Sequence, residues 1–230
     1  MGPLATLIFN PMKKQLILFV LLFCCFSCAS QKKEIITKST IKLEGRNTNI
    51  RDLIEIDGYY HPIPNYLQYN SNRMFFEDGT WVNFHIKMDL SDDEINANMS
   101  KSVKSWIKDN QIRWGTYWGV YTIQSDTIIV YYYDKGSFWK GWSLDEIRYK
   151  IIDRTTIQVI YSKSLLKRDE TYYRDMNVNP WTNGSYLFFT PADSLPSSDN
   201  WLKEEKWIWR NEQDWKEYME KIKQKKVKKK

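Results

Sequence analysis

The sequence predicts an all-β domain in which eight short antiparallel strands follow one another and close into an up-and-down barrel. Three pairs of strand-like segments flank the short polar sequences 78–79, 125–126 and 153–154, as in hairpins. Hydrophobic and polar residues alternate along 146–151, which is the period of a half-buried strand. Hydrophobic residues make up 42% of the chain and aromatic residues 16%. This composition can bury a core, so it excludes disordered and fibrous proteins.

The eight expected strands can be assigned in chain order. We expect them at 54–60, 73–77, 80–87, 119–124, 127–134, 146–152, 155–162 and 185–190. Between the second and third, Asp78-Gly79 suits a two-residue type I′ turn. A sandwich of two sheets is the alternative arrangement, but a closed barrel leaves no exposed strand edge. A barrel of eight strands is just wide enough to be filled by side chains or to hold one small ligand.

Two helices accompany these strands. The first covers 91–109, between the third and fourth strands, and begins with a capping box that is followed by apolar residues at every fourth position. It could close one mouth of the barrel as a lid or pack against the outer wall. The second helix begins near Asn211 as its N-cap and carries Trp215, Met219 and Ile222 on one face.

The formal net charge of +6 belongs to the two ends of the chain. Two lysines precede Cys28 and seven lie in 221–230, so removing both segments leaves a charge of −3 on 28–220. A nucleic-acid-binding domain gathers Lys and Arg on its folded face, so we expect no nucleic acid as partner. The Lys-rich tail 221–230 is interpreted as a solvated end or as a site for anionic lipid headgroups. Residues 206–210 fit either a ninth strand or a helix.

A targeting segment precedes the body. A basic Met-Lys-Lys sequence, the apolar run 16–26 and a small residue at the processing point form a secretory signal, and the run is too short to span a bilayer. We assign 1–27 to a signal peptide, with 1–11 attributed to an upstream start codon. Residues 25–28 resemble a bacterial lipobox, which implies that Cys28 is diacylated and becomes the first residue of the mature chain.

The three cysteines all lie in this segment, so no disulfide can form within the mature chain. Residues 28–49 are polar and weakly patterned, and we interpret them as a lipidated flexible tether that would place the barrel domain, 50–220, about 25 Å from the membrane. Among lipoproteins that share this pattern, a residue other than Asp after the lipid cysteine resembles an outer-membrane signal. Ala29 therefore implies an outer-membrane lipoprotein that faces the periplasm.

No catalytic constellation is evident in the sequence. The body has two histidines, His61 and His85, on separate strands, and it has no Gly-x-Ser-x-Gly, Walker or Rossmann motif. Metal hydrolases need three or four convergent ligands, often His. Helix capping explains the acidic run 92–94. We therefore expect no enzymatic activity, no metal and no cofactor.

Aromatic residues indicate function more strongly, since all eleven Trp and fifteen Tyr follow Cys28. Many lie at or beside strand ends, where in a barrel they would line the interior or one rim. Trp81, Asn83 and His85 share one strand face, which is favoured as an outer face but would line a mixed pocket if it pointed inward. Large rings also serve as core filler. The candidate ligand-binding residues are Tyr60, Trp81, Asn83, His85, Trp118, Tyr132, Trp139 and Trp142.

Gly58-Tyr59-Tyr60 stands in the first strand where lipocalins usually have Gly-x-Trp, and serial hairpins and a helix after the eighth strand follow. In these features the chain, over residues 54–226, resembles a lipocalin-like lipoprotein of the Gram-negative envelope. The resemblance implies a closed antiparallel barrel with a central calyx for a small hydrophobic or amphipathic molecule. It implies no catalytic residues.

The leading hypothesis is a lipid-anchored barrel that binds such a molecule in the periplasm. The alternative is a structural or protein-interaction lipoprotein, such as an inhibitor of an envelope enzyme, whose barrel is filled by its own aromatic rings. The strand pattern cannot separate the two, because an occupied interior and a packed interior use the same residue types.

Overall fold

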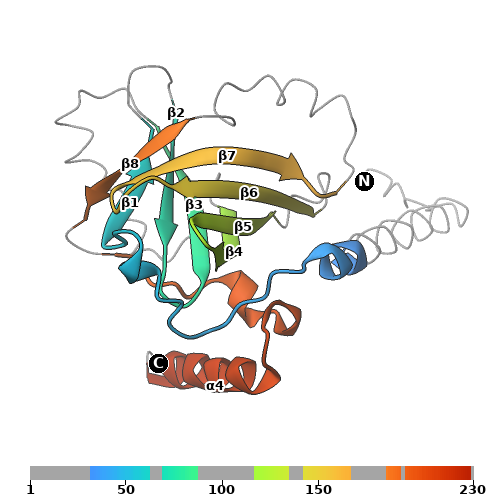
Figure 1. The fold of residues 1–230 in the computed structure, drawn as a ribbon. Coiled ribbons are helices and arrows are strands. Elements are labelled where there is room, and N and C mark those ends of the chain that lie inside the picture. Colours follow the sequence, from blue (N-terminus) through green and yellow to red (C-terminus); the bar gives the residue numbers. More distant parts are fainter. Residues whose placement is uncertain are drawn as a thin grey trace, which may run out of the picture.

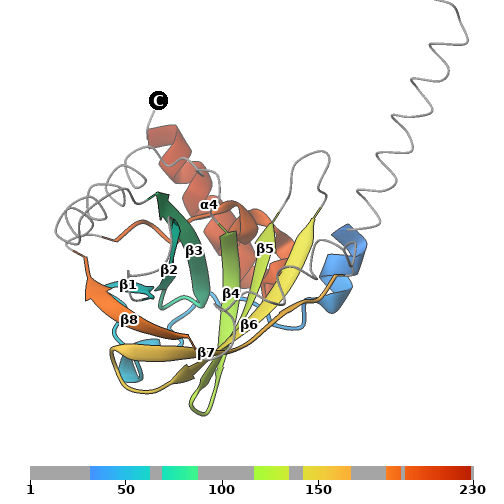
Figure 2. The ribbon, with the colours of Figure 1, turned by 90° about the horizontal axis from the view of Figure 1, so that it is seen from above.

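The structure, a computed structural model, describes residues 32–62, 69–87, 117–134, 142–166, 185–192 and 195–228. Eight strands form one closed antiparallel barrel in chain order (Figures 1 and 2). They are β1 (Gly58–His61), β2 (Tyr69–Phe75), β3 (Thr80–Lys87), β4 (Tyr117–Gln124), β5 (Thr127–Asp134), β6 (Ser143–Ile151), β7 (Thr156–Ser164) and β8 (Tyr186–Pro191). The predicted fold class is confirmed, and each expected strand overlaps an observed one.

The β2–β3 connection differs from the predicted type I′ turn. It spans 76–79, and among these residues only Gly79 has a positive φ, of 89°. A type I′ turn needs positive φ at both central residues. The Asp78 carboxylate instead accepts hydrogen bonds from the backbone N–H of Thr80 at 3.0 Å and from its hydroxyl at 2.6 Å, which fixes the turn around Gly79.

The strand register determines which side chains point into the barrel. Tyr149 of β6 is fully buried, whereas Lys150, on the opposite face of the same strand, is exposed. The face of Tyr149 is therefore the interior one, because consecutive strand residues alternate between faces. Pairing carries this face around the barrel to Ile128, Val130, Tyr132, Trp81, Phe75, Tyr60, Leu187 and Val159.

Trp81 and Asn83 thus point inward, and the preference for an outward orientation of their face is wrong. The opposite face of β3 carries Val82 and Phe84, which are also buried. They can point outward because a second layer, formed by the N- and C-terminal segments, packs on that side of the barrel wall.

The two ends of the barrel differ in their connections. At the end we call the short-turn end, strands are joined by 76–79, 125–126 and 152–155; at the long-connection end, they are joined by 62–68, 88–116, 135–142 and 165–185. The chain before β1 closes the short-turn end. Its 3₁₀ turn η1 (Ile50–Asp52) and the following Ile54 contribute fully buried side chains to the interior cluster. Residues 54–57, which were expected to begin the first strand, belong instead to this closing segment, 50–57, which we call the plug.

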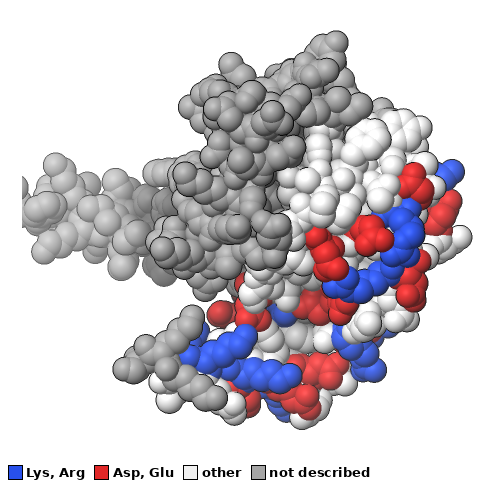
Figure 3. Space-filling model, turned by 90° about the vertical axis from the view of Figure 1, so that its left-hand side faces the viewer, with Lys and Arg blue, Asp and Glu red and all other residues white. Residues whose placement is uncertain are grey.

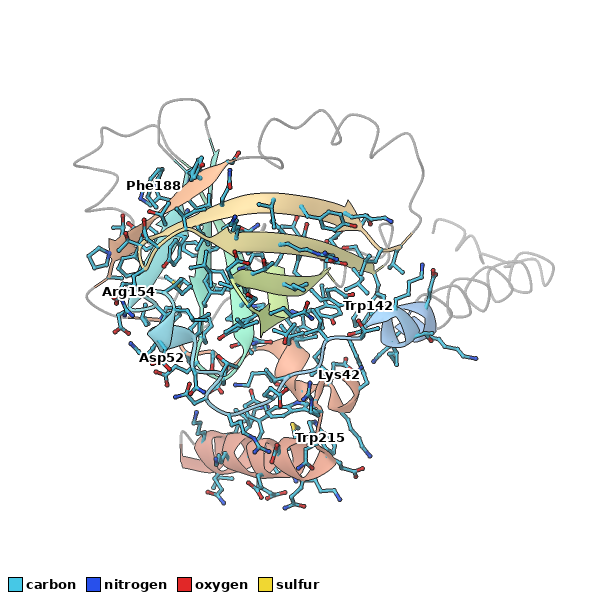
Figure 4. The ribbon with its side chains drawn as sticks, in the orientation of Figure 1. Lys42, Asp52, Trp142, Arg154, Phe188 and Trp215 are labelled. Atoms are coloured by element: carbon cyan, nitrogen blue, oxygen red, sulfur yellow. The ribbon has the colours of Figure 1, made fainter. Side chains whose placement is uncertain are left out.

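Charged side chains at the short-turn end pair with one another. Arg51 binds Asp57 at 2.6 Å and also Glu77, and Arg154 binds Glu55 at 2.7 Å. Figure 3 views the molecule from the side on which Figure 4 places Asp52 and Arg154, and there basic and acidic side chains alternate. This end therefore presents a balanced mixture of charges to solvent.

Residues 32–49 are packed on the barrel and differ in this from the expected flexible tether. Residues 32–38 are helical, and Ile35 and Leu43 are 0% and 1% exposed. The segment is also hydrogen-bonded to the body, since the Ser39 and Tyr133 hydroxyls lie 2.5 Å apart and the Leu43 N–H donates to the Ile208 carbonyl at 2.7 Å. Ile35 and Leu43 are isolated apolar residues in a polar stretch and form no periodic pattern. The sequence therefore did not predict that this segment packs on the barrel.

The C-terminal segment forms the other half of the outer layer. It contains two 3₁₀ turns and one long helix: η3 (Trp201–Glu204), η4 (Lys206–Ile208) and α4 (Glu212–Lys228). Residues 206–210 are thus a 3₁₀ turn followed by a parallel bridge between Trp209 and Leu43. Gly45 lies against the Trp209 ring so closely that a Cβ atom would meet it at 2.4 Å.

The predicted C-terminal helix is confirmed. The Asn211 side chain caps it by accepting from the Gln213 N–H at 2.8 Å. Trp215 and Tyr218 pack the helix against the outer layer, and the helix continues through the expected Lys-rich tail as far as Lys228.

A buried ion pair joins the C-terminal segment to the β2–β3 turn. The Lys203 ammonium, 5% exposed as a residue, lies 2.8 Å from the Asp78 carboxylate and 4.8 Å from the centre of the Tyr218 ring. Burial opposes ionisation of Asp78. The Lys203 charge, together with hydrogen bonds from Lys203, Thr80 and Ser198, nevertheless holds the pKa of this carboxyl below its ordinary value.

Three predicted features lie outside the described residues: the signal peptide 1–27, Cys28 and the helix 91–109. Within the described part of the chain, no helix combines the length and hydrophobicity needed to cross a bilayer.

Candidate functional site in the barrel interior

The structure brings four of the predicted ligand-binding side chains to the barrel interior. They are Tyr60, Trp81, Asn83 and Tyr132. The Trp81 and Tyr132 rings have centroids 5.5 Å apart, and Tyr117 lies 6.0 Å from Tyr132. His85 occupies a position on the same face of β3, but its side chain is outside the described set.

Trp118 and Trp142 lie elsewhere. Trp118 follows Tyr117 along β4 and therefore points outward, where it stacks on Phe76 with ring centroids 6.1 Å apart. Trp142 directly precedes β6 at the long-connection end, where its ring is 5.7 Å from that of Trp201 (Figure 4). Trp139 lies outside the described residues.

The half of the interior at the short-turn end is filled by side chains. The Phe75 ring makes edge contacts with Tyr60, Tyr121 and Tyr149 at centroid distances of 5.9, 5.7 and 5.8 Å. The Tyr60 hydroxyl donates to the carbonyls of Glu55 and Arg154, both at 3.0 Å. Burial raises the pKa of the Tyr60 phenol. Tyr60 is therefore part of the packed floor, where it binds the plug and the β6–β7 turn.

The half at the long-connection end is polar. Continuing the interior face along each strand places Ser143, which is buried, and eight half-buried residues there: Arg73, Asn83, Tyr117, Tyr132, Asp134, Asp145, Ser162 and Ser164. Sequence analysis identified only Asn83 and Tyr132 among them. The signal that finds the others is the strand register, because alternation alone does not say which face of each strand is the inner one.

Two hydrogen-bond donors lie at the boundary between the halves. The Trp81 indole N–H is buried, and within the described part of the chain it has no hydrogen-bond partner. The Tyr149 hydroxyl, on a residue 0% exposed, lies close to the Arg73 guanidinium but makes no hydrogen bond of good geometry. Burial raises the pKa of the Tyr149 phenol, so the hydroxyl stays protonated at neutral pH. Buried polar groups are normally paired, so these two donors favour an acceptor that the described residues do not supply.

Among the described side chains, the candidate site holds no group of metal ligands. No three His, Cys, Asp or Glu residues converge there. His61 points outward from β1, and its ring nitrogens lie 2.8 Å from the Pro62 carbonyl and 2.9 Å from the Thr190 hydroxyl. Burial lowers the pKa of His61, which favours the neutral ring in this role.

Comparison of the chain with protein-family models, with curated proteins and with solved structures finds no match. The fold itself, a closed eight-stranded antiparallel barrel of the kind that lipocalins have, is the class to which the structure assigns the protein.

Proposed function

We propose that the protein binds one small amphipathic ligand in the half of the barrel interior at the long-connection end. The observation that carries the proposal is the contrast within the interior, where a largely buried apolar floor lies below a ring of mostly half-buried polar and aromatic residues. Ligand sites are typically apolar and aromatic with a few polar groups that fix orientation. A ligand's apolar part would pack on Trp81 and Tyr132, and its acceptor oxygen would meet the donors Trp81 Nε1 and Tyr149 Oη.

The alternative is a barrel filled by its own side chains that acts as a structural or protein-interaction lipoprotein. The aromatic packing around Phe75 favours it for the short-turn half. The Trp81 indole N–H, which has no hydrogen-bond partner among the described residues, favours ligand binding for the other half, because a packed protein core normally satisfies its buried donors.

We further propose that the protein is held in the bacterial cell envelope by lipid on Cys28, at the outer membrane and facing the periplasm, and that it has no catalytic activity. The leader pattern of 1–28 supports the anchor. The aromatic and polar composition of the described interior residues supports binding of a ligand.

Adjacent tyrosines of β5 provide a matched test of ligand binding. Tyr132 points inward and Tyr131 points outward, where its hydroxyl accepts from Thr40 at 3.2 Å. Titration with the fluorescent amphiphile 11-dansylaminoundecanoate is expected to give saturable binding that Tyr132→Ala weakens at least tenfold and Tyr131→Ala leaves within twofold. Thermal unfolding of both variants checks that they are folded. No binding, or equal effects of the two changes, would refute a ligand site in the interior and favour the filled barrel.

A further inference from the structure

The packing of residues 32–49 restricts where a lipid on Cys28 can lie. Only three residues, 29–31, separate Cys28 from Lys32, and the four Cα–Cα steps between these two residues span at most about 14 Å in a fully extended chain. From Lys32 onward the chain is held to the body. The anchor cannot therefore act through a long tether, and the surface around 32–38 must lie close to the bilayer. This step rests on the lipid anchor proposed above.

The helical residues 32–38 are fixed by several contacts. Ile35 inserts into the outer apolar layer. The Lys32 ammonium binds the Glu205 carboxylate at 2.9 Å, and the Lys38 ammonium donates to the Leu165 carbonyl at 2.7 Å. Hydrogen bonds between Leu43 and both Ile208 and Arg210 continue the attachment beyond the helix. Residues 32–49 therefore move with the barrel.

These contacts place residues 32–38 beside the long-connection end of the barrel. Leu165 directly follows β7, and Trp142 directly precedes β6, so both belong to connections at that end. Lys32 lies 5.5 Å above the Trp142 ring. In Figure 4, Trp142 lies next to the helical segment 32–38, whereas Asp52 and Arg154 lie at the far side of the barrel. The anchor and the polar half of the interior are thus on the same side of the molecule.

The surface around this segment has the composition of a membrane interface. Ile36 is 37% exposed, and Lys33, one helical turn before it, is also exposed, whereas the ammonium groups of Lys32 and Lys38 are bound to Glu205 and to the Leu165 carbonyl. The Trp142–Trp201 pair is only partly buried. Trp and Lys are the residues that favour the headgroup region, where the indole packs on the acyl boundary and the ammonium meets lipid phosphate. At the short-turn end, Arg51 and Arg154 are paired with Asp57 and Glu55, and the described connections of that end contain no tryptophan.

We infer that the long-connection end of the barrel lies against the bilayer surface, with residues 32–38 and the Trp142–Trp201 pair at the level of the phospholipid headgroups. The ligand that enters the interior is then a membrane-resident amphiphile, which passes between bilayer and barrel without a free path through water. The orientation also points the balanced charges of the short-turn end away from the membrane.

A pair of single-cysteine labels tests this orientation, because the body contains no cysteine of its own. A nitroxide is placed at Ile36→Cys or at Ile152→Cys, which is 45% exposed in a short-turn connection. The acylated protein is reconstituted in vesicles of phosphatidylethanolamine and phosphatidylglycerol. Relative to the soluble Cys28→Ser form, collision with oxygen is expected to rise and collision with a polar nickel complex to fall at least threefold at position 36. Position 152 is expected to keep its aqueous accessibility.

The same experiment separates failure of the anchor from failure of the orientation. Sedimentation with vesicles and the intact mass report acylation of Cys28 before any label is read, and an unmodified, non-sedimenting protein refutes the anchor. An acylated, sedimenting protein in which position 36 stays as accessible to the nickel complex as in the soluble form, or in which position 152 becomes protected, overturns the orientation alone. Insertion of a 20-residue Gly/Ser spacer between Gln31 and Lys32 should leave acylation intact and restore aqueous accessibility at position 36.

Discussion

The two ends of this barrel are built from the same strands but differ in what fills them. At the short-turn end, η1 and the chain that follows it insert Ile50 and Ile54 among packed aromatic rings, and most of the interior residues there are buried. At the long-connection end, the described interior residues are polar or aromatic, and most of them are half-buried. The difference shows how one closed sheet can separate a core that stabilises the fold from a surface that is available for binding.

The separation has a physical basis in strand alternation. Every second residue of each strand points into the barrel along its whole length. The inward face of one strand can therefore be apolar at one end of the barrel and polar at the other. On β3 this face changes from Trp81 to Asn83 within two residues. Packing energy therefore concentrates near the plug, and residues toward the opposite mouth can change with less effect on the free energy of unfolding.

The largest expected effect comes from Phe75→Ala. Phe75 contacts three rings in the packed half, and its loss leaves a cavity that should lower the free energy of unfolding by about 3–5 kcal/mol. Asn83 lies on the neighbouring strand, two residues beyond Trp81, which pairs with Phe75. Asn83→Ala should lower the free energy of unfolding by about 1 kcal/mol or less. Urea denaturation of both variants provides the measurement. Equal losses would show that the two halves are packed alike and would remove the basis for a ligand site.

Much of the barrel could be predicted from sequence, because its signals are local. Alternation along β6 and the polar turns at 125–126 and 153–154 specify hairpins without knowledge of their neighbours. The order of the eight strands then follows from short connections. What could not be predicted is the inner face of each strand. On β3 the outer face carries the apolar residues Val82 and Phe84, which the outer layer covers, so both faces of the strand are buried.

The outer layer was missed for a related reason. Ile35 and Leu43 are isolated apolar residues in a polar sequence, and only the tertiary contacts with Ile208 and Trp209 give them a role. Likewise Arg73, Tyr117 and Asp145 share the interior with Trp81 through register alone. Long-range pairing of this kind leaves no local pattern in a single sequence. The Asn211 cap of α4, in contrast, is a local signal that can be recognised from the residue type and its position.

A second, smaller effect is expected from Lys203→Met, which tests how the short-turn end is held to the C-terminal segment. Removing Lys203 leaves the Asp78 carboxylate without its counter-charge and should lower the free energy of unfolding by about 3 kcal/mol. Lys225→Met is the matched control, because Lys225 binds Asp199 at 2.8 Å with 64% of its side chain exposed, and such pairs contribute less than about 1 kcal/mol. Similar losses in the two variants would contradict a special role for the buried pair.

The pH dependence of the same variant has a definite sign. The folded-state pKa of Asp78 is lowered from the ordinary value of 3.8, so its ionisation stabilises the fold fully above that pH. This contribution is lost as the pH falls through the lowered pKa. Without Lys203 the lowering should disappear, and the difference in unfolding free energy between wild type and Lys203→Met should shrink between about pH 4 and pH 2. A constant difference over that range would show that the pair is not ionised as described.

The smallest effect is expected from Arg51→Ala, at the outer surface of the short-turn end. Arg51 bridges Asp57 and Glu77, and these hydrogen bonds raise the pKa of its guanidinium, but its side chain is 45% exposed. Solvent and salt screen such pairs, so the free energy of unfolding should fall by less than about 1 kcal/mol, and by less still in 0.5 M NaCl. Because this end faces away from the bilayer in the orientation inferred above, sedimentation of the acylated protein with phosphatidylglycerol vesicles should be unchanged. A loss of vesicle binding in Arg51→Ala, with stability intact, would place the membrane at the short-turn end and reverse the assignment of the two ends.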